Sequence, residues 1–148
     1  MSPVSLSSSS KSRQGTAAAV LSAVAMVPIL VHVLDDATGG VLSDTLDAGS
    51  QGAIIGLALA VQMLFALGAM RESRAGYGGV LVLAGLWVGV SVLDHAAAFG
   101  GGDFGGGFLS RLAVWGVVAF QGLAALTALA ALRSRRRTSF SGTGWFGS

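Results

Sequence analysis

The sequence predicts an all-α integral membrane protein with four transmembrane helices, and three observations support this. Hydrophobic residues make up 53% of the chain and charged residues only 11%, far below the roughly 25% charged residues of soluble domains. The apolar residues fall into four runs, each near the ~20 residues with which a helix crosses a bilayer. Basic residues gather before the first run, between the second and third, and after the fourth. This places them on one side of the membrane, as is typical of a multi-pass protein.

The four predicted helices lie at about residues 16–34, 53–70, 79–98 and 112–132. Backbone groups in lipid must pair within their own segment, so these runs are expected to be helical. None carries the charged stripe that a helix of a soluble bundle would show. Residues 16–133 are therefore predicted to form one transmembrane domain. Residues 1–15 are cationic, Ser-rich and expected to be disordered, and residues 134–148 form a basic, then aromatic and Gly/Ser-rich tail.

The distribution of charge predicts the orientation. Basic residues precede the first run, separate the second from the third and follow the fourth; these are Lys11, Arg13, Arg71, Arg74, Arg133, Arg135, Arg136 and Arg137. The connections on the opposite side hold all six aspartates, with Arg111 as their one basic residue. By the positive-inside rule, both termini are expected in the cytoplasm and the acidic connections outside the cell membrane.

The two halves of the chain align without a gap when Asp35 is placed on Asp94. The other matched polar residues are Asp44 with Asp103, Gln62 with Gln121, and Arg74 with Arg133. Apolar matches are expected by chance in so apolar a chain, so the polar matches carry the comparison. The sequence therefore predicts two tandem copies of a helical hairpin in the same orientation, a parallel repeat.

Both histidines lie where a predicted helix meets an acidic connection. His32 precedes Asp35 and Asp36 by three and four residues, so these side chains share a helix face. Asp94 and His95 are adjacent in the matching stretch of the second half, and packing as a repeat would bring all five residues to one membrane surface. Nitrogen and carboxylate ligands suit zinc or a similar divalent metal. A proton or cation relay in a small transporter is a further alternative.

Two other interpretations of this stretch stay open. In the plain structural one, the aspartates mark where helices leave the membrane and the histidines bind a neighbour. In the other, the histidines ligate a haem. Against haem, the repeat alignment places His95 four residues further out than His32, which is about 6 Å along a helix.

Several residues within the runs are expected to shape the helices. Gln62 and Gln121 lie at mid-membrane depth and are predicted to face inward, bonding to each other or to backbone. Pro28 is expected to break one backbone hydrogen bond and kink the first helix one turn before His32. Small residues four apart are expected to let helices approach closely; these are Gly52 with Gly56, Gly85 with Gly89, and Ala124 with Ala128.

The sequence contains no cysteine and no hydrolase, zinc-protease or ATPase motif, so we expect no enzyme. The predicted function is that of a structural or accessory membrane module without a cofactor. The alternative is a small transporter, or a membrane protein that binds a metal or haem. The expected partners are the lipid bilayer and a second copy or another membrane subunit, and not nucleic acid. Ala and Gly richness, and basic residues of which only Lys11 is a lysine, favour a prokaryotic source.

Overall fold

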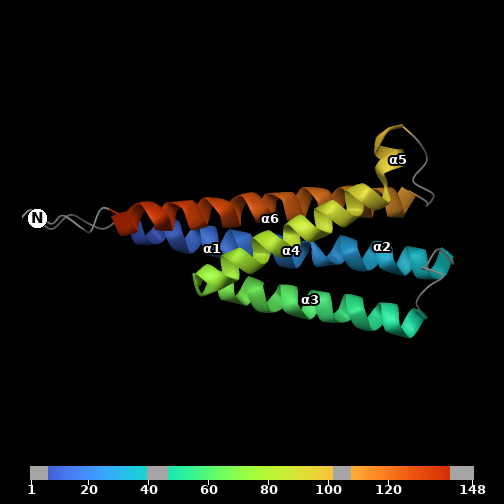
Figure 1. The fold of residues 1–148 in the computed structure, drawn as a ribbon, viewed down its shortest axis with the longest axis horizontal. Coiled ribbons are helices and arrows are strands. Elements are labelled where there is room, and N and C mark those ends of the chain that lie inside the picture. The colour runs from blue at the N-terminus through green and yellow to red at the C-terminus, as the bar shows by residue number, and fades with distance from the viewer. Residues whose placement is uncertain (1–6, 40–46, 102–107, 141–148) are drawn as a thin grey trace, which may run out of the picture.

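The structure is a computed structural model that describes residues 7–39, 47–101 and 108–140. Over these residues every element is a helix and no strand occurs. The elements are α1 (Ser7–Val24), α2 (Met26–Gly39), α3 (Ala48–Met70), α4 (Arg74–Asp94), α5 (Ala96–Phe99) and α6 (Phe108–Phe140) (Figure 1). Four stretches are long and apolar enough to cross a membrane: Arg13–Asp35, Gly49–Met70, Arg74–Asp94 and Phe108–Arg136. The prediction of an all-α chain with four helices able to span a membrane is confirmed.

The helices extend beyond the predicted apolar runs. The first begins at Ser7, so residues 7–15 are helical where we expected disorder. The last continues to Phe140, into the predicted tail, whose residues 141–148 lie outside the described part of the chain. Helical hydrogen bonds form within the segment itself, so a packed helix can continue into polar sequence beyond the apolar run.

The predicted third helix is displaced and divided. It was expected over residues 79–98, whereas α4 begins at Arg74 and ends at Asp94. A separate short helix, α5, follows after His95. The Ser73 side chain accepts a hydrogen bond from the Gly76 N–H at 2.9 Å and so caps the start of α4.

The first membrane-spanning stretch consists of α1 and α2, which are divided at Ala25. Pro28 follows three residues later; it has no N–H to donate to the Val24 carbonyl, and its ring crowds that carbonyl. The Ala25 N–H still donates to the Leu21 carbonyl at 3.0 Å. As a result, α1 and α2 follow each other along nearly the same line (Figure 1).

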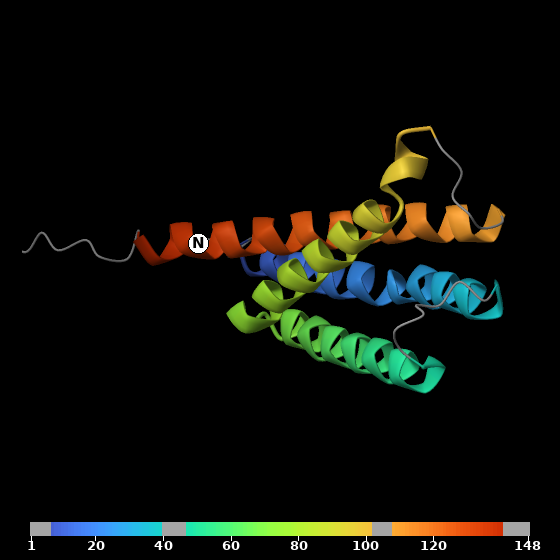
Figure 2. The ribbon, with the colours of Figure 1, turned by 45° about the vertical axis from the view of Figure 1, so that its right-hand side comes forward.

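The membrane-spanning helices form a ring in which α1 packs on α3, α3 on α4, α4 on α6, and α6 on α1, with α2 continuing along α6. The start of α1, the end of α6 and the turn between α3 and α4 lie together; we call this the arginine end, after Arg74 and Arg133. The opposite end is the histidine end, after His32 and His95. Figure 2 shows α4 crossing from beside α3 at the arginine end to beside α6 at the histidine end.

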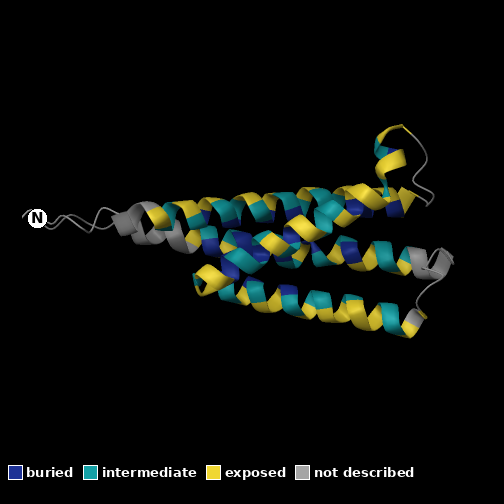
Figure 3. Cartoon of the chain, viewed as in Figure 1, coloured by how far each residue is buried: buried dark blue, intermediate teal, exposed yellow. Residues whose placement is uncertain are grey.

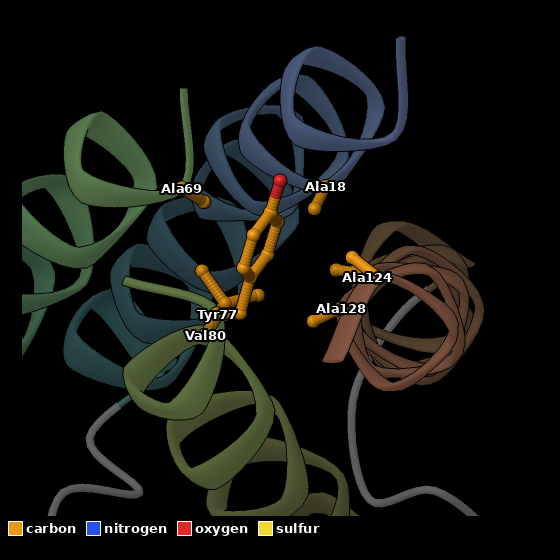
Figure 4. Packing of buried hydrophobic residues seen from close by; sticks show 7 residues of the cluster. Ala18, Ala69, Tyr77, Val80, Ala124 and Ala128 are labelled. Atoms are coloured by element: carbon orange, nitrogen blue, oxygen red, sulfur yellow. The ribbon is translucent and has the colours of Figure 1, made fainter. Parts of the chain in front are cut away.

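The core of the arginine end is built from small residues around one tyrosine. Tyr77 and Val80 from α4 pack with alanines of the neighbouring helices (Figure 4); these are Ala18, Ala69, Ala124, Ala128 and Ala131. A Cβ on Gly76 would lie 2.2 Å from the Gly68 carbonyl carbon, so the backbones of α3 and α4 are in contact. Close backbone approach of this kind is how helices associate where lipid supplies no hydrophobic drive.

The glycine pairs predicted to mediate packing make no close contact within the chain. A Cβ on Gly52, Gly56, Gly85 or Gly89 would meet no atom within 4 Å. The pair Ala124 and Ala128 is fully buried, as expected. The glycines that do allow close contact are Gly15, Gly68, Gly76, Gly79 and Gly116. Small residues occur on every helix face of this chain, so their spacing alone does not identify the packed face.

The histidine end is packed by fewer helices. In α3 no residue from 49 to 61 is buried, whereas Gln62, Ala66 and Ala69 are; Figure 3 shows the exposed positions along this helix. The core of the histidine end comes from α2 and α6, where Ile29 and Val114 are buried. One long side of α3 is therefore open to the surroundings.

Candidate metal site at the histidine end

The structure brings together three of the five residues singled out at the predicted helix ends. His32 from α2 and Asp94 and His95 from the end of α4 each offer one ligand atom, and these atoms lie within 4.8 Å of one another. The two imidazole rings have centroids 5.0 Å apart and are tilted by 57°. Groups from two membrane-spanning helices therefore meet at one point.

The end of α4 explains why the side chains of Asp94 and His95 lie close together. Adjacent residues on a regular helix point to different sides. His95 leaves the helix, with φ −108° and ψ 21°, and its N–H donates back to the Ser91 carbonyl at 3.2 Å. With this change of backbone direction, the His95 Nδ1 lies 3.8 Å from the Asp94 carboxylate.

A backbone carbonyl fixes the tautomer of His95. Its Nδ1 lies 3.1 Å from the Ser91 carbonyl oxygen. A carbonyl oxygen can only accept, so Nδ1 is the donor in this contact, and Nε2 is then the ring nitrogen whose lone pair can bind an ion. Metal-binding histidines usually donate their second nitrogen to a carbonyl or carboxylate in this way.

The hydroxyl of Ser110 is the hydrogen-bond partner of Nδ1 in His32, as the Ser91 carbonyl is in His95. The His32 Nδ1 lies 3.2 Å from the Ser110 Oγ, which comes from the first turn of α6 and belongs to a buried residue. When Nδ1–H donates to this hydroxyl, Nε2 is the nitrogen left to bind an ion. No feature of the sequence indicated Ser110, because a serine near a helix start is common and its partner His32 lies 78 residues away in the chain.

Of the other two predicted residues, only Asp35 has a side chain that the structure describes, and it does not join the group. Asp35 is half-buried on α2, and it is absent from the set of converging ligand atoms. Asp36 lies in α2, but its side chain is outside the part that the structure describes. The Asp94 side chain is 68% exposed, so the carboxylate side of the cluster is open to small molecules.

Both intramembrane amides face the interior, but they do not bond to each other. The Gln62 Nε2 donates to the Ser22 carbonyl at 2.7 Å. The Gln62 Oε1 and both polar atoms of Gln121 are buried with no hydrogen-bond partner among the described residues. The buried polar side chains in the described ranges are Ser22, Gln62, Ser91, Ser110 and Gln121.

The distance between the two histidines bears on haem. Two axial imidazoles sit on opposite faces of a porphyrin, with the iron and the macrocycle between them. Ring centroids 5.0 Å apart with a 57° tilt leave too little room for that arrangement. The donor set of two imidazole nitrogens and one carboxylate oxygen fits a bare divalent ion better.

Comparison with protein-family models, curated proteins and solved structures gave no significant match for this chain.

Proposed function

We propose that this chain is a multi-pass protein of a prokaryotic cell membrane that binds a divalent transition-metal ion at its histidine end. The observation that supports this is the meeting of His32, Asp94 and His95 within 4.8 Å. The contact between the His95 Nδ1 and the Ser91 carbonyl supports it further, because metal-binding histidines usually donate their second nitrogen in this way. No catalytic step is part of the proposal.

The membrane orientation that goes with this function puts the histidine end outside the cell. Both described chain ends lie at the arginine end, where the basic residues gather (Figure 1). Positive charge on the cytoplasmic side supports cytoplasmic termini. A duplicated hairpin is supported by the ring of contacts, in which α1 packs on α3 as α4 packs on α6.

The chemistry of the donors selects the class of ion. Magnesium and calcium prefer oxygen ligands alone, whereas imidazole suits zinc and copper. Three protein ligands leave a fourth tetrahedral position for water or a further donor, as in open zinc sites. Zn²⁺ and Cu²⁺ are therefore the ions to test.

The test is a calorimetric titration of the detergent-purified, chelator-treated protein with Zn²⁺ and Cu²⁺. We expect one ion per chain. His32→Ala and His95→Ala should each weaken binding by about a hundredfold or more, since removing even a supporting residue costs 10–100-fold. Asp47→Asn removes a carboxylate at the same end but outside the cluster, and it should leave the affinity unchanged.

A spectroscopic measurement makes the test independent of affinity. Bound Cu²⁺ should show hyperfine coupling to imidazole nitrogen, and this coupling should be lost in the doubly substituted His32→Ala, His95→Ala protein. If the doubly substituted protein binds one ion with the same affinity and spectrum, the proposed function is wrong.

A second candidate function is a structural module that associates with another copy of itself. The open side of α3 supports it, because a Cβ on Gly52 or Gly56 would meet nothing within 4 Å. Small residues four apart allow two such helices to approach closely. Gly56→Leu should convert a dimer to a monomer in native mass spectrometry, whereas Gly85→Leu, on an open face of α4, should not. A wild-type monomer in lipid nanodiscs would exclude this role.

A further inference from the structure

We propose that the pocket between α4 and α6 at the arginine end binds the headgroup phosphate of an anionic phospholipid. This α4–α6 pocket has a volume of about 440 Å³ and is lined by Arg74, Leu81, Leu129, Leu132, Arg133 and Arg136. It lies at the opposite end of the bundle from the metal site and shares no residue with it.

The lining residues follow the order of groups in a phospholipid. Arg74 is the first residue of α4, and Leu81 lies about two turns further into the span. On α6 the leucines come before Arg133 and Arg136, so the guanidinium groups sit at the outer edge and the leucines lie deeper. A phosphate head with an acyl chain matches this order, whereas a free phosphate uses only the arginines.

Spacing along α6 puts the two kinds of group on one face. Leu129, Leu132, Arg133 and Arg136 are separated by three, one and three residues, which is the repeat of a single helix stripe. The face that carries this stripe is the wall of the pocket toward α4. One lipid can therefore contact the leucines and the arginines at once.

Within the described residues, no acidic side chain pairs with the arginines of the pocket. Its three arginines are exposed, and no ion pair in the described part of the chain involves them. The nearby acid, Glu72, is already bound to Arg135 at 2.8 Å, and that guanidinium lies 5.3 Å above the Tyr77 ring. Arginine binds phosphate with paired N–H groups, so three unneutralised guanidiniums favour a phosphate ligand.

The membrane supplies the proposed ligand on the side where the arginines are expected. Anionic lipids give the cytoplasmic leaflet a negative surface, and basic pockets between helices on that side bind their headgroups. Phosphatidylglycerol is the probe, and phosphatidylcholine with the same acyl chains is the control for the headgroup. Glycerol phosphate is the control for a soluble phosphate.

The experiment measures binding and thermal unfolding of the detergent-solubilised protein with each of these three compounds. Phosphatidylglycerol should be retained in native mass spectrometry and should raise the midpoint of unfolding, because a ligand of the folded state stabilises it. Phosphatidylcholine should be retained at least about tenfold less, since it has no net charge to attract. Glycerol phosphate should bind at least about tenfold more weakly, because it lacks the chains that contact the leucines.

Variants assign the binding to the pocket. Arg74→Gln and Arg133→Gln should each weaken phosphatidylglycerol binding about five- to tenfold. Arg71→Gln removes a charge at the same end, outside the pocket, and should change the affinity less than about twofold. Arg133→Lys keeps the charge but not the paired N–H groups, so it should recover only part of the affinity. If Arg133→Gln loses helix content, Arg136→Gln, nearer the end of α6, replaces it.

Three results would overturn the proposal. Equal retention of phosphatidylcholine would remove the role of the headgroup charge. An equal loss in Arg71→Gln would show general attraction to the surface and no defined pocket. Glycerol phosphate binding as tightly as the lipid would assign the arginines to a soluble phosphate.

Discussion

The two ends of the bundle are held together by different means. At the arginine end four helices meet, α3 and α4 touch through Gly68 and Gly76, and Glu72 on the turn binds Arg135 of α6. At the histidine end no residue of α3 from 49 to 61 is buried. There a hydrogen bond between His32 and Ser110 joins α2 to α6, and the rings of His32 and His95 meet between α2 and α4. One end is closed by backbone contact, and the other is left partly open with polar groups gathered in it.

This difference indicates how stability and ligand binding are divided. In lipid there is no hydrophobic force between helices, so close van der Waals packing of small residues supplies most of the association. Most of the close glycine contacts lie at the arginine end, and the contact between Gly116 and Pro28 lies nearer the other end. Regions with less packing open at lower free energy and more often carry ligand sites. We therefore expect substitutions at the arginine end to change stability and those at the histidine end to change ion binding.

The largest effect is expected from Gly76→Ala. The new Cβ would lie 2.2 Å from the Gly68 carbonyl carbon, so the α3 and α4 backbones would have to move apart. We expect the free energy of unfolding to fall by about 3 kcal/mol, at the upper end of the usual cost of overpacking. Unfolding of the detergent-solubilised protein, followed by loss of helix signal, measures this change.

Gly78→Ala is the matched control, because the same methyl group on the same helix would meet nothing within 4 Å. It should be neutral or stabilising by up to about 1 kcal/mol, from the higher helix propensity of alanine. Equal destabilisation by both substitutions would contradict the assignment of stability to the contact between Gly68 and Gly76.

Ser110→Ala probes the other end. It removes the hydroxyl 3.2 Å from the His32 Nδ1 but keeps all three proposed ligands. We expect Zn²⁺ affinity to fall about tenfold, as is usual when a supporting hydrogen bond is lost, with little change in unfolding. The Ser134 hydroxyl donates to the Ala131 carbonyl on the same helix, so Ser134→Ala should leave ion affinity unchanged. A fall in stability without a change in affinity would assign Ser110 to packing.

Two leucine substitutions examine the boundary between the ends. Gln121→Leu replaces a buried amide that has no partner in the described structure, so we expect a gain of about 1 kcal/mol in unfolding free energy. Gln62→Leu removes the bond to the Ser22 carbonyl and should cost about 1 kcal/mol. The same unfolding assay compares them. If both substitutions destabilise the protein equally, the Gln121 amide forms a stabilising hydrogen bond, and the prediction for Gln121 is wrong.

The smallest effect is expected from Asp47, the exposed N-cap of α3 at the histidine end. Its carboxylate accepts from the Ser50 hydroxyl at 2.6 Å and from the Ser50 N–H at 2.9 Å, and these bonds lower its pKa below the ordinary 3.8. The cap should therefore be fully formed above about pH 4 and lost as the pH falls through the lowered pKa. Amide exchange of Ser50, corrected for its intrinsic rate, should show this dependence. Asp47→Asn should remove it.

The sequence by itself determined the number and kind of the helices. Few charges and four long apolar runs leave no other stable form in lipid, because every backbone group must be paired within its own segment. The depth of Gln62 and Gln121 in the apolar runs predicted that they face the interior. The polar residues at the ends of the runs predicted a site of five residues, His32, Asp35, Asp36, Asp94 and His95, of which the structure brings three together. These predictions depend on periodicity, depth and composition, all of which are local properties of the chain.

Only the tertiary structure decided which faces meet. The glycines that make no close contact have the same chemistry as those that pack; they include Gly52, Gly56 and Gly85. The contact that holds α3 and α4 together is formed by Gly68 and Gly76. The partnership of His32 with Ser110 depends on how α2 and α6 are rotated against each other. Rotation about a helix axis is set by the sum of many weak contacts with distant segments, and a chain rich in small apolar residues on every face does not encode it locally.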